Sequence, residues 1–118
     1  MLIRNTGWYK GFSPAEIKKL LNQFGAWVDR MSNEGKVKGA FPLAHEGKIV
    51  AGRKAVIDGP FAESKEAIAG YILIRADSLD EAVEIAKSAP CLEYGEILEV
   101  RAIVREAPEI QIARQLTL

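Results

Sequence analysis

Residues 69–76 read AGYILIRA, and this stretch decides the fold. Its centre, Tyr71 to Ile74, is apolar at successive positions, so both faces of a β-strand built from it would carry apolar side chains. Such a strand is typical of the middle of a sheet that is covered on each side. The segment therefore predicts a central strand, and the rest of the chain should supply its neighbours and its cover.

A helix should follow this strand directly. Ser78-Leu79-Asp80-Glu81 has the capping-box pattern that begins helices, and Pro90 ends the helix because proline cannot continue it. Residues 96–105 then alternate, which predicts a last strand. The alternation puts side chains on opposite faces, with Leu98, Val100, Ala102 and Val104 on one and Ile97, Glu99, Arg101, Ile103 and Arg105 on the other. Residues 106–118 form an apolar-rich tail that could be a helix or a strand.

The residues before the central strand predict one helix and three strands. Met1 to Asn5 is a short apolar run. Ser13 and Glu16 form another capping box, with Pro14 at the first helical position. The helix that follows carries an apolar stripe made of Ile17, Leu20, Leu21, Phe24, Val28 and Met31. Residues 37–43 and 48–57 are strand-like, and we expect a hairpin turn at residues 45–47 to join them.

The predicted order is strand, helix, strand, strand, strand, helix, strand. Two helices over one face of a mainly antiparallel sheet is the ferredoxin-like α+β layout, here with an extra hairpin strand. We expect the first helix to pack over Val100 and Ala102, with Leu21 buried in that contact. Ile97 and Ile103 would lie on the face that the helices leave open, so we expect a homodimer that covers it.

The composition is that of one globular domain. The chain has 118 residues, of which 48% are hydrophobic and 27% charged. Lys and Arg number 16, as do Asp and Glu, so no net charge favours nucleic acid or an anionic membrane as a partner. No apolar run approaches the ~20 residues of a membrane span. The first residues also lack the pattern of a secretion signal, and we expect a cytoplasmic protein.

The chain has one cysteine and one histidine, which limits the disulfides and metal sites that it can form. Cys91 has no intrachain partner for a disulfide and should be a small, partly buried apolar residue. His45 should be a solvated loop residue. These two residues do not make a metal-ligand pattern, so we expect neither a metal nor a cofactor. The aromatic residues of the first loop should cap the core, line a pocket entrance or pack on a partner; they are Trp8, Tyr9 and Phe12.

Residues 54–66, KAVIDGPFAESKE, resemble the signature of the DGPF proteins within the YCII-related group. The likeness extends over residues 1–105 and leaves 106–118 as a C-terminal tail that could associate with the dimer. It implies a dimeric α/β barrel, in which two ferredoxin-like sheets face each other, in a bacterial family without an established reaction. Some members of this family are encoded beside, or fused to, sigma factors of the extracytoplasmic-function type. The wider group carries a histidine and an aspartate suspected of catalysis, the histidine on a helix, but His45 does not fall at that position.

Four residues are candidates for a site. Asp58 would either bond to local N–H groups in its Asp-Gly-Pro turn or bind a ligand and handle protons at the mouth of the inter-sheet cavity. Glu99 and Arg101 project from the same face and would form a structural ion pair or hold a ligand. Tyr71 is the remaining candidate for ligand binding. We expect Asp58, Glu99 and Arg101 to converge on one cavity, where the guanidinium would bind an anionic ligand.

These residues leave three functions open. The first is a dimeric module that binds a small ligand between the sheets, with the link to transcription regulation that the family resemblance implies. The second is a cofactor-independent enzyme in which Asp58, with Arg101, does acid–base chemistry. The third is an interaction protein whose dimer surface is its working part.

Overall fold

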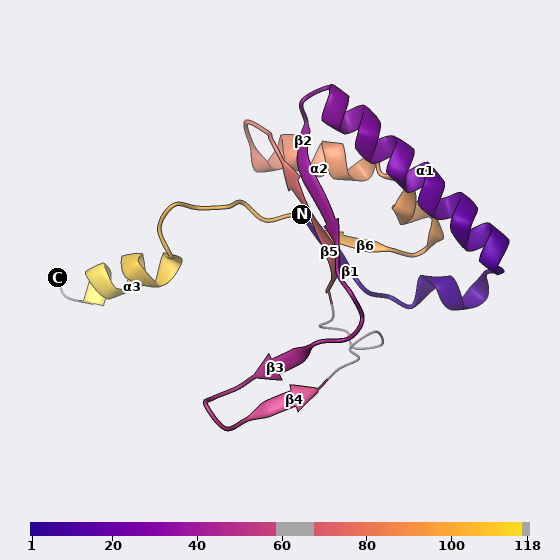
Figure 1. The fold of residues 1–118 in the computed structure, drawn as a ribbon. Coiled ribbons are helices and arrows are strands. Elements are labelled where there is room, and N and C mark those ends of the chain that lie inside the picture. Colours follow the sequence, from indigo (N-terminus) through magenta and orange to yellow (C-terminus); the bar gives the residue numbers. More distant parts are fainter. Residues whose placement is uncertain (59–67, 117–118) are drawn as a thin grey trace.

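The computed structural model describes residues 1–58 and 68–116, and Figure 1 shows their arrangement. The elements in chain order are β1 (Leu2–Arg4), η1 (Trp8–Gly11), α1 (Pro14–Asn33), β2 (Val37–Pro42), β3 (Lys48–Val50), β4 (Val56–Asp58), β5 (Ile68–Ile74), α2 (Leu79–Lys87), η2 (Pro90–Tyr94), β6 (Ile97–Glu99) and α3 (Pro108–Leu116). Four strands form an antiparallel sheet in the order β2-β5-β1-β6, while β3 and β4 pair only with each other. The fold is the expected α+β arrangement of the ferredoxin-like type, with a hairpin inserted between β2 and β5.

Both predicted helix starts are confirmed. The Ser13 hydroxyl accepts a hydrogen bond from the Glu16 N–H, and the Glu16 carboxylate accepts one from the Ser13 N–H. The Ser78 hydroxyl accepts from the Glu81 N–H in the same way. The Glu81 carboxylate, however, accepts from the N–H of Asp77, one residue earlier than a capping box requires. None of the helices in the described part of the chain is long and apolar enough to cross a membrane.

The central strand is confirmed, but the described residues cover it on one side only. β5 lies between β2 and β1. Ile72 has no exposed surface and packs with Trp27 of α1 and Ile85 of α2. Tyr71 and Leu73 point to the opposite face, where each is 37% exposed. The hydrophobic core therefore sits between the helices and one face of the sheet.

The predicted hairpin around His45 is wrong. β2 pairs with β5, whereas the hairpin joins β3 to β4. Its turn contains Gly52 at φ 105°, and the Ala51 N–H donates to the Ala55 carbonyl at 2.8 Å. A left-handed glycine allows this tight reversal, and β2 takes no part in the hairpin because its partner is β5. His45 is exposed, and its ring stacks on that of Tyr9 with centroids 6.0 Å apart.

The predicted last strand is too long. β6 covers Ile97–Glu99 rather than residues 96–105. Its partner β1 has only three residues, each of which already pairs with one residue of β6, so within residues 1–58 and 68–116 no strand lies beside residues 100–105. Beyond β6 the chain leaves the sheet, and the tail forms helix α3, which stands apart from the other helices in Figure 1.

The predicted packing of α1 is also partly wrong. Leu21 is 51% exposed, and Ala102 is exposed as well, so the expected contact between them does not form. α1 packs on the sheet through Trp27 and Met31, in its second half. Trp27 is held there by its indole N–H, which donates to the Ser88 hydroxyl at 2.9 Å. The first half of α1 instead borders a cavity, where Leu21 is one of the lining residues.

Candidate functional site

Two of the predicted site residues lie in one row across the sheet face away from the helices. Leu2 of β1 pairs with Tyr71 on one side and with Glu99 on the other. The Arg4 guanidinium lies 3.0 Å from the Glu99 carboxylate, and the Phe41 ring centroid is 5.2 Å from that of Tyr71. We call this surface the open face; it comprises Leu2, Arg4, Phe41, Tyr71, Leu73, Ile97 and Glu99.

Arg101 and Asp58 lie differently. The Arg101 side chain is 75% exposed, and its Nη1 is 4.0 Å from Oε2 of Glu99, so the pair is loose. Asp58 ends β4, where its carboxylate is 3.4 Å from Lys48 Nζ and 73% exposed. The structure thus brings Tyr71 and Glu99 to one side of the sheet, with Arg101 near Glu99, and puts Asp58 at the end of β4 in the hairpin. Figure 1 shows this hairpin below the four-stranded sheet. The rest of the motif, residues 59–66, lies outside the described residues, and the convergence of Asp58 with Glu99 and Arg101 stays a prediction.

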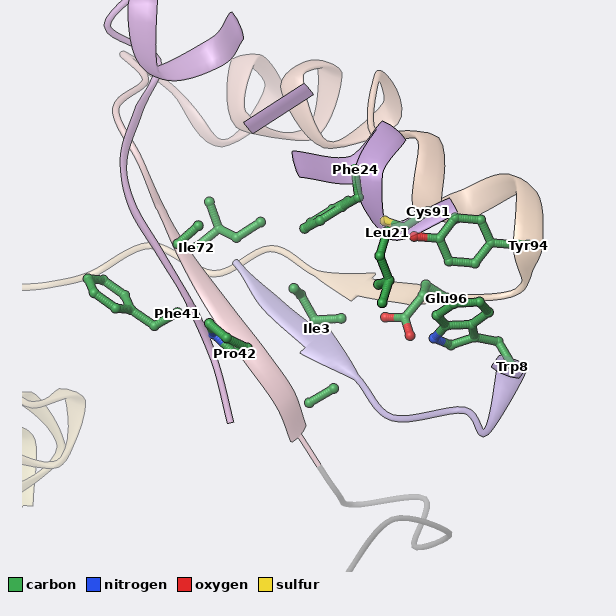
Figure 2. Close-up of a pocket in the computed structure, with 12 residues that line it drawn as sticks. Ile3, Trp8, Leu21, Phe24, Phe41, Pro42, Ile72, Cys91, Tyr94 and Glu96 are labelled. Carbon is green, nitrogen blue, oxygen red and sulfur yellow. The ribbon is translucent and has the colours of Figure 1, made fainter. Parts of the chain in front are cut away.

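A cavity of about 290 Å³ lies on the other face, between the sheet and α1. Its floor includes Ile3 of β1 and Ile72 of β5, and Leu21 and Phe24 approach it from α1 (Figure 2). Its remaining walls come from β2, η1, η2 and the residue before β6. The lining is mainly apolar, and its one carboxyl group among the described residues is that of Glu96, beside the Trp8 indole, the Cys91 thiol and the Tyr94 hydroxyl.

A glycine turn places this carboxyl group. η2 ends at Tyr94, and Gly95 follows at φ 102°, a left-handed conformation that residues with a Cβ rarely adopt. The Glu96 N–H then donates to the Cys91 carbonyl at 3.1 Å. Trp8 packs against Tyr94 with ring centroids 4.3 Å apart, and its indole N–H donates to the Glu96 carboxyl group. In Figure 2 the carboxyl group points between Ile3 and Trp8.

The environment of Glu96 favours the protonated form of its carboxyl group. The residue is 8% exposed. Burial raises the pKa of its carboxyl group from 4.5 to about 7, because the charged form loses its hydration, and the hydrogen bond from Trp8 opposes this shift. Oε2 is buried and has no hydrogen-bond partner among residues 1–58 and 68–116. Near neutral pH the group therefore exists in both the acid and the carboxylate form.

The other acidic groups of the cavity are protonated at neutral pH. Burial, reinforced by the nearby Glu96, raises the pKa of the Cys91 thiol to about 12. Burial also raises the pKa of the Tyr94 hydroxyl, with smaller effects from Cys91 and Glu96. Cys91 is 2% exposed, so it is buried more deeply than the partial burial expected of it, and its protonated thiol is a poor nucleophile. Within the described part of the chain, no lysine, arginine or histidine lines this cavity.

Glu96 was not identified from the sequence as a site residue, although its place in the alternating pattern indicates one. The alternation that puts Leu98 and Val100 on the helix-facing side puts Glu96 on the same side. A carboxyl group in an apolar row of that kind is unusual and indicates either a buried partner or a site. Of the three positions expected for Trp8, as a core cap, at a pocket entrance or against a partner, the structure supports the pocket, since Trp8 lies in its wall.

Comparison with known proteins gives a family and one partial relative. The family model of the YCII-related domain matches residues 8–111 of this chain. An uncharacterised protein of Rhizobium meliloti (strain 1021) is 54% identical over 37 residues, which make up 31% of this chain and 30% of the relative. The chain thus matches less than a third of that relative's length, and nothing about the activity of the whole relative carries over.

Proposed function

This chain belongs to the YCII-related domain family, and we propose that it binds a small, mainly apolar molecule in the pocket between α1 and the sheet. The observation that carries this proposal is the Glu96 carboxyl group, which is buried in an apolar cavity with Oε2 unpartnered among the described residues. The cavity volume, about 290 Å³, is near the lower end of the range for ligand pockets. A few convergent polar groups in an apolar lining are typical of such pockets.

The alternative to a binding site is a purely structural role for Glu96. Buried polar groups in native proteins nearly always have a hydrogen-bond partner, and an unsatisfied one costs about 1–3 kcal/mol of stability. A structural carboxyl group would therefore be expected to use both oxygens within the fold. A ligand atom beside Oε2 would remove this cost only when bound, which favours a site over a structural element.

The expected ligand site between two sheets is less well supported than this pocket. We include the homodimer in the proposal, because the open face leaves Phe41 48% and Ile97 57% exposed on a sheet that, in the described part of the chain, has helices on one side only. Such a dimer would cover the open face and leave the pocket, on the opposite side, accessible in each copy. The link to transcription stays a prediction from the family resemblance.

A second function is an enzyme that uses Glu96 as a general acid or base. A pKa of about 7 favours it, since a proton-transfer group works best when its pKa is near the operating pH. Asp58 is less suited to this role because it is exposed and paired with Lys48. An enzyme of this kind should exchange the α-hydrogens of a bound ketone with deuterated water, and Glu96→Gln should abolish the exchange.

The binding proposal is tested with a library of small apolar and polar compounds and ligand-observed NMR. Leu21→Trp should fill the pocket without loss of folding, because Leu21 is 51% exposed at its edge. The matched control is Leu79→Trp, at a residue that is 55% exposed and outside this pocket. Compounds that bind the wild type should lose binding to Leu21→Trp and keep it in Leu79→Trp. Equal binding to both variants, or no binding compound at all, would overturn the proposal.

A further inference from the structure

The charge state of the pocket restricts what can enter it. The groups that face Glu96 are the Trp8 indole from η1 and the Cys91 thiol and Tyr94 hydroxyl from η2. α1 and the sheet contribute only uncharged side chains to the lining. An anionic ligand would find no cation among the described lining residues and would meet a carboxyl group instead, so the pocket disfavours anions.

One hydrogen-bonding position in the pocket is open. The Trp8 indole N–H already donates to the Glu96 carboxyl group, whereas Oε2 has no partner within the described ranges. The pocket that contains this atom is lined by aromatic and aliphatic side chains, including Phe24, Ile3 and Tyr94 (Figure 2). The geometry therefore offers a buried carboxyl oxygen without a partner in a mainly apolar space.

We infer, as an extension that rests on the proposed function, that the ligand is a neutral, largely aromatic or aliphatic molecule with one carbonyl-type oxygen, which accepts a hydrogen bond from Glu96. In the protonated form of Glu96, the hydroxyl group is the donor that such an oxygen needs. The contact satisfies the buried carboxyl group and leaves no charge in the apolar cavity.

An ammonium ligand is the competing class, because a carboxylate among aromatic rings can also hold a cation. The burial of the Glu96 carboxyl group disfavours an ammonium ligand in this pocket. The site itself raises the pKa of Glu96 by desolvation, and an ammonium group would have to lose its own hydration as well. The two classes predict opposite pH dependence: a carbonyl ligand binds the protonated acid and weakens as pH rises through about 7, whereas an ammonium ligand binds the carboxylate and strengthens.

The test uses four probes of nearly equal shape: acetophenone, ethylbenzene, α-methylbenzylamine and benzoate. Binding is followed by NMR through the indole N–H of Trp8, with the indole N–H of Trp27, buried and bonded to Ser88, as the internal control. Acetophenone should bind about 2- to 10-fold more tightly than ethylbenzene below about pH 6, the ratio expected for one added hydrogen bond. This preference should disappear above about pH 8.

Three variants test whether Glu96 causes the preference for acetophenone over ethylbenzene. Glu96→Gln retains a hydrogen-bond donor without titrating, so acetophenone should keep its preference at every pH. Glu96→Leu should remove the preference while ethylbenzene still binds. Glu93→Gln, at an exposed residue of η2, should behave as the wild type does.

Each other outcome overturns the inference in a distinct way. Tighter binding of α-methylbenzylamine as pH rises would show an ammonium site, and tightest binding of benzoate would show an anion site. Equal binding of the four probes would leave the pocket as a binding site but remove Glu96 from recognition. If no probe moves the Trp8 signal while library compounds still bind in a Leu21-dependent manner, the ligand class is wrong and the proposed function stands.

Discussion

At the scale of single residues, burial decides what a glutamate does in this protein. Glu93 and Glu96 are three positions apart, yet Glu93 lies exposed on η2 and Glu96 is 8% exposed in the cavity wall. The difference arises from Gly95, whose left-handed backbone turns the chain inward between them. A carboxyl group moved from water into an apolar wall favours its proton, so the two residues differ in chemistry although they are the same amino acid.

The raised pKa of Glu96 predicts a pH-dependent stability. The folded state binds the proton more tightly than the unfolded state, whose pKa is near 4.5. The stabilisation is therefore complete below about pH 4.5 and is lost as pH rises through about 7, a total of about 3 kcal/mol. Urea unfolding from pH 4 to 8 should show this loss in the wild type and in Glu93→Gln, and Glu96→Gln should lack it. Identical pH profiles for wild type and Glu96→Gln would contradict the burial of this group.

At the scale of elements, the sheet depends on close contact between strand backbones. Gly70 of β5 pairs with Ile3 of β1 on one side and with Pro42 of β2 on the other, and it is buried. A Cβ at this position would lie 2.7 Å from the Phe41 carbonyl oxygen and 3.2 Å from the Pro42 Cα. Both are backbone atoms, which cannot move without opening the β2–β5 pairing.

Gly70→Ala should therefore destabilise the fold by about 1–3 kcal/mol, the usual cost of overpacking. Gly25→Ala is the matched control, because a Cβ at Gly25 meets nothing within 4 Å and alanine favours the helix. It should stabilise the protein by about 0.5–1 kcal/mol. Thermal unfolding of both variants checks the pair, and a neutral Gly70→Ala would mean that β2 is displaced from β5 at this point.

At the scale of the whole molecule, apolar surface remains uncovered. The open face carries Tyr71 and Leu73 at 37% exposure each, and farther along the chain Ile103 is 84% and Leu116 83% exposed. Large apolar side chains gathered on one face indicate an interaction surface rather than a solvated one. A second copy would supply the layer that the central strand lacks, and we predict a homodimer on this ground.

Leu73→Lys should weaken this dimer, because a lysine in the covered face would be buried without a partner. The control is Leu92→Lys, at a residue of similar exposure, 39%, on η2. Light scattering at micromolar concentration should give a dimer for the wild type and for Leu92→Lys, and a larger monomer fraction for Leu73→Lys. A monomeric wild type would refute the dimer without bearing on the pocket.

The sequence by itself determined the features whose causes lie within a few residues. The capping hydroxyls of Ser13 and Ser78 bond to N–H groups three positions away, so both helix starts could be located from local pattern. The apolar run in residues 69–76 likewise predicted the central strand, and the motif at residues 54–66 pointed to the family that the family model confirms.

Only the tertiary structure decided which distant residues meet. The length of β6 is limited by β1, at the other end of the chain, and the turn of the hairpin follows from β2 pairing with β5 instead of β3. The pocket forms where Trp8, from the first loop, lies beside Glu96. The left-handed turn at Gly95 brings Glu96 to this position. Burial is a property of the assembled walls and not of the residue. Local pattern could therefore place Glu96 on a sheet face, whereas its protonation and its role depend on contacts across most of the chain.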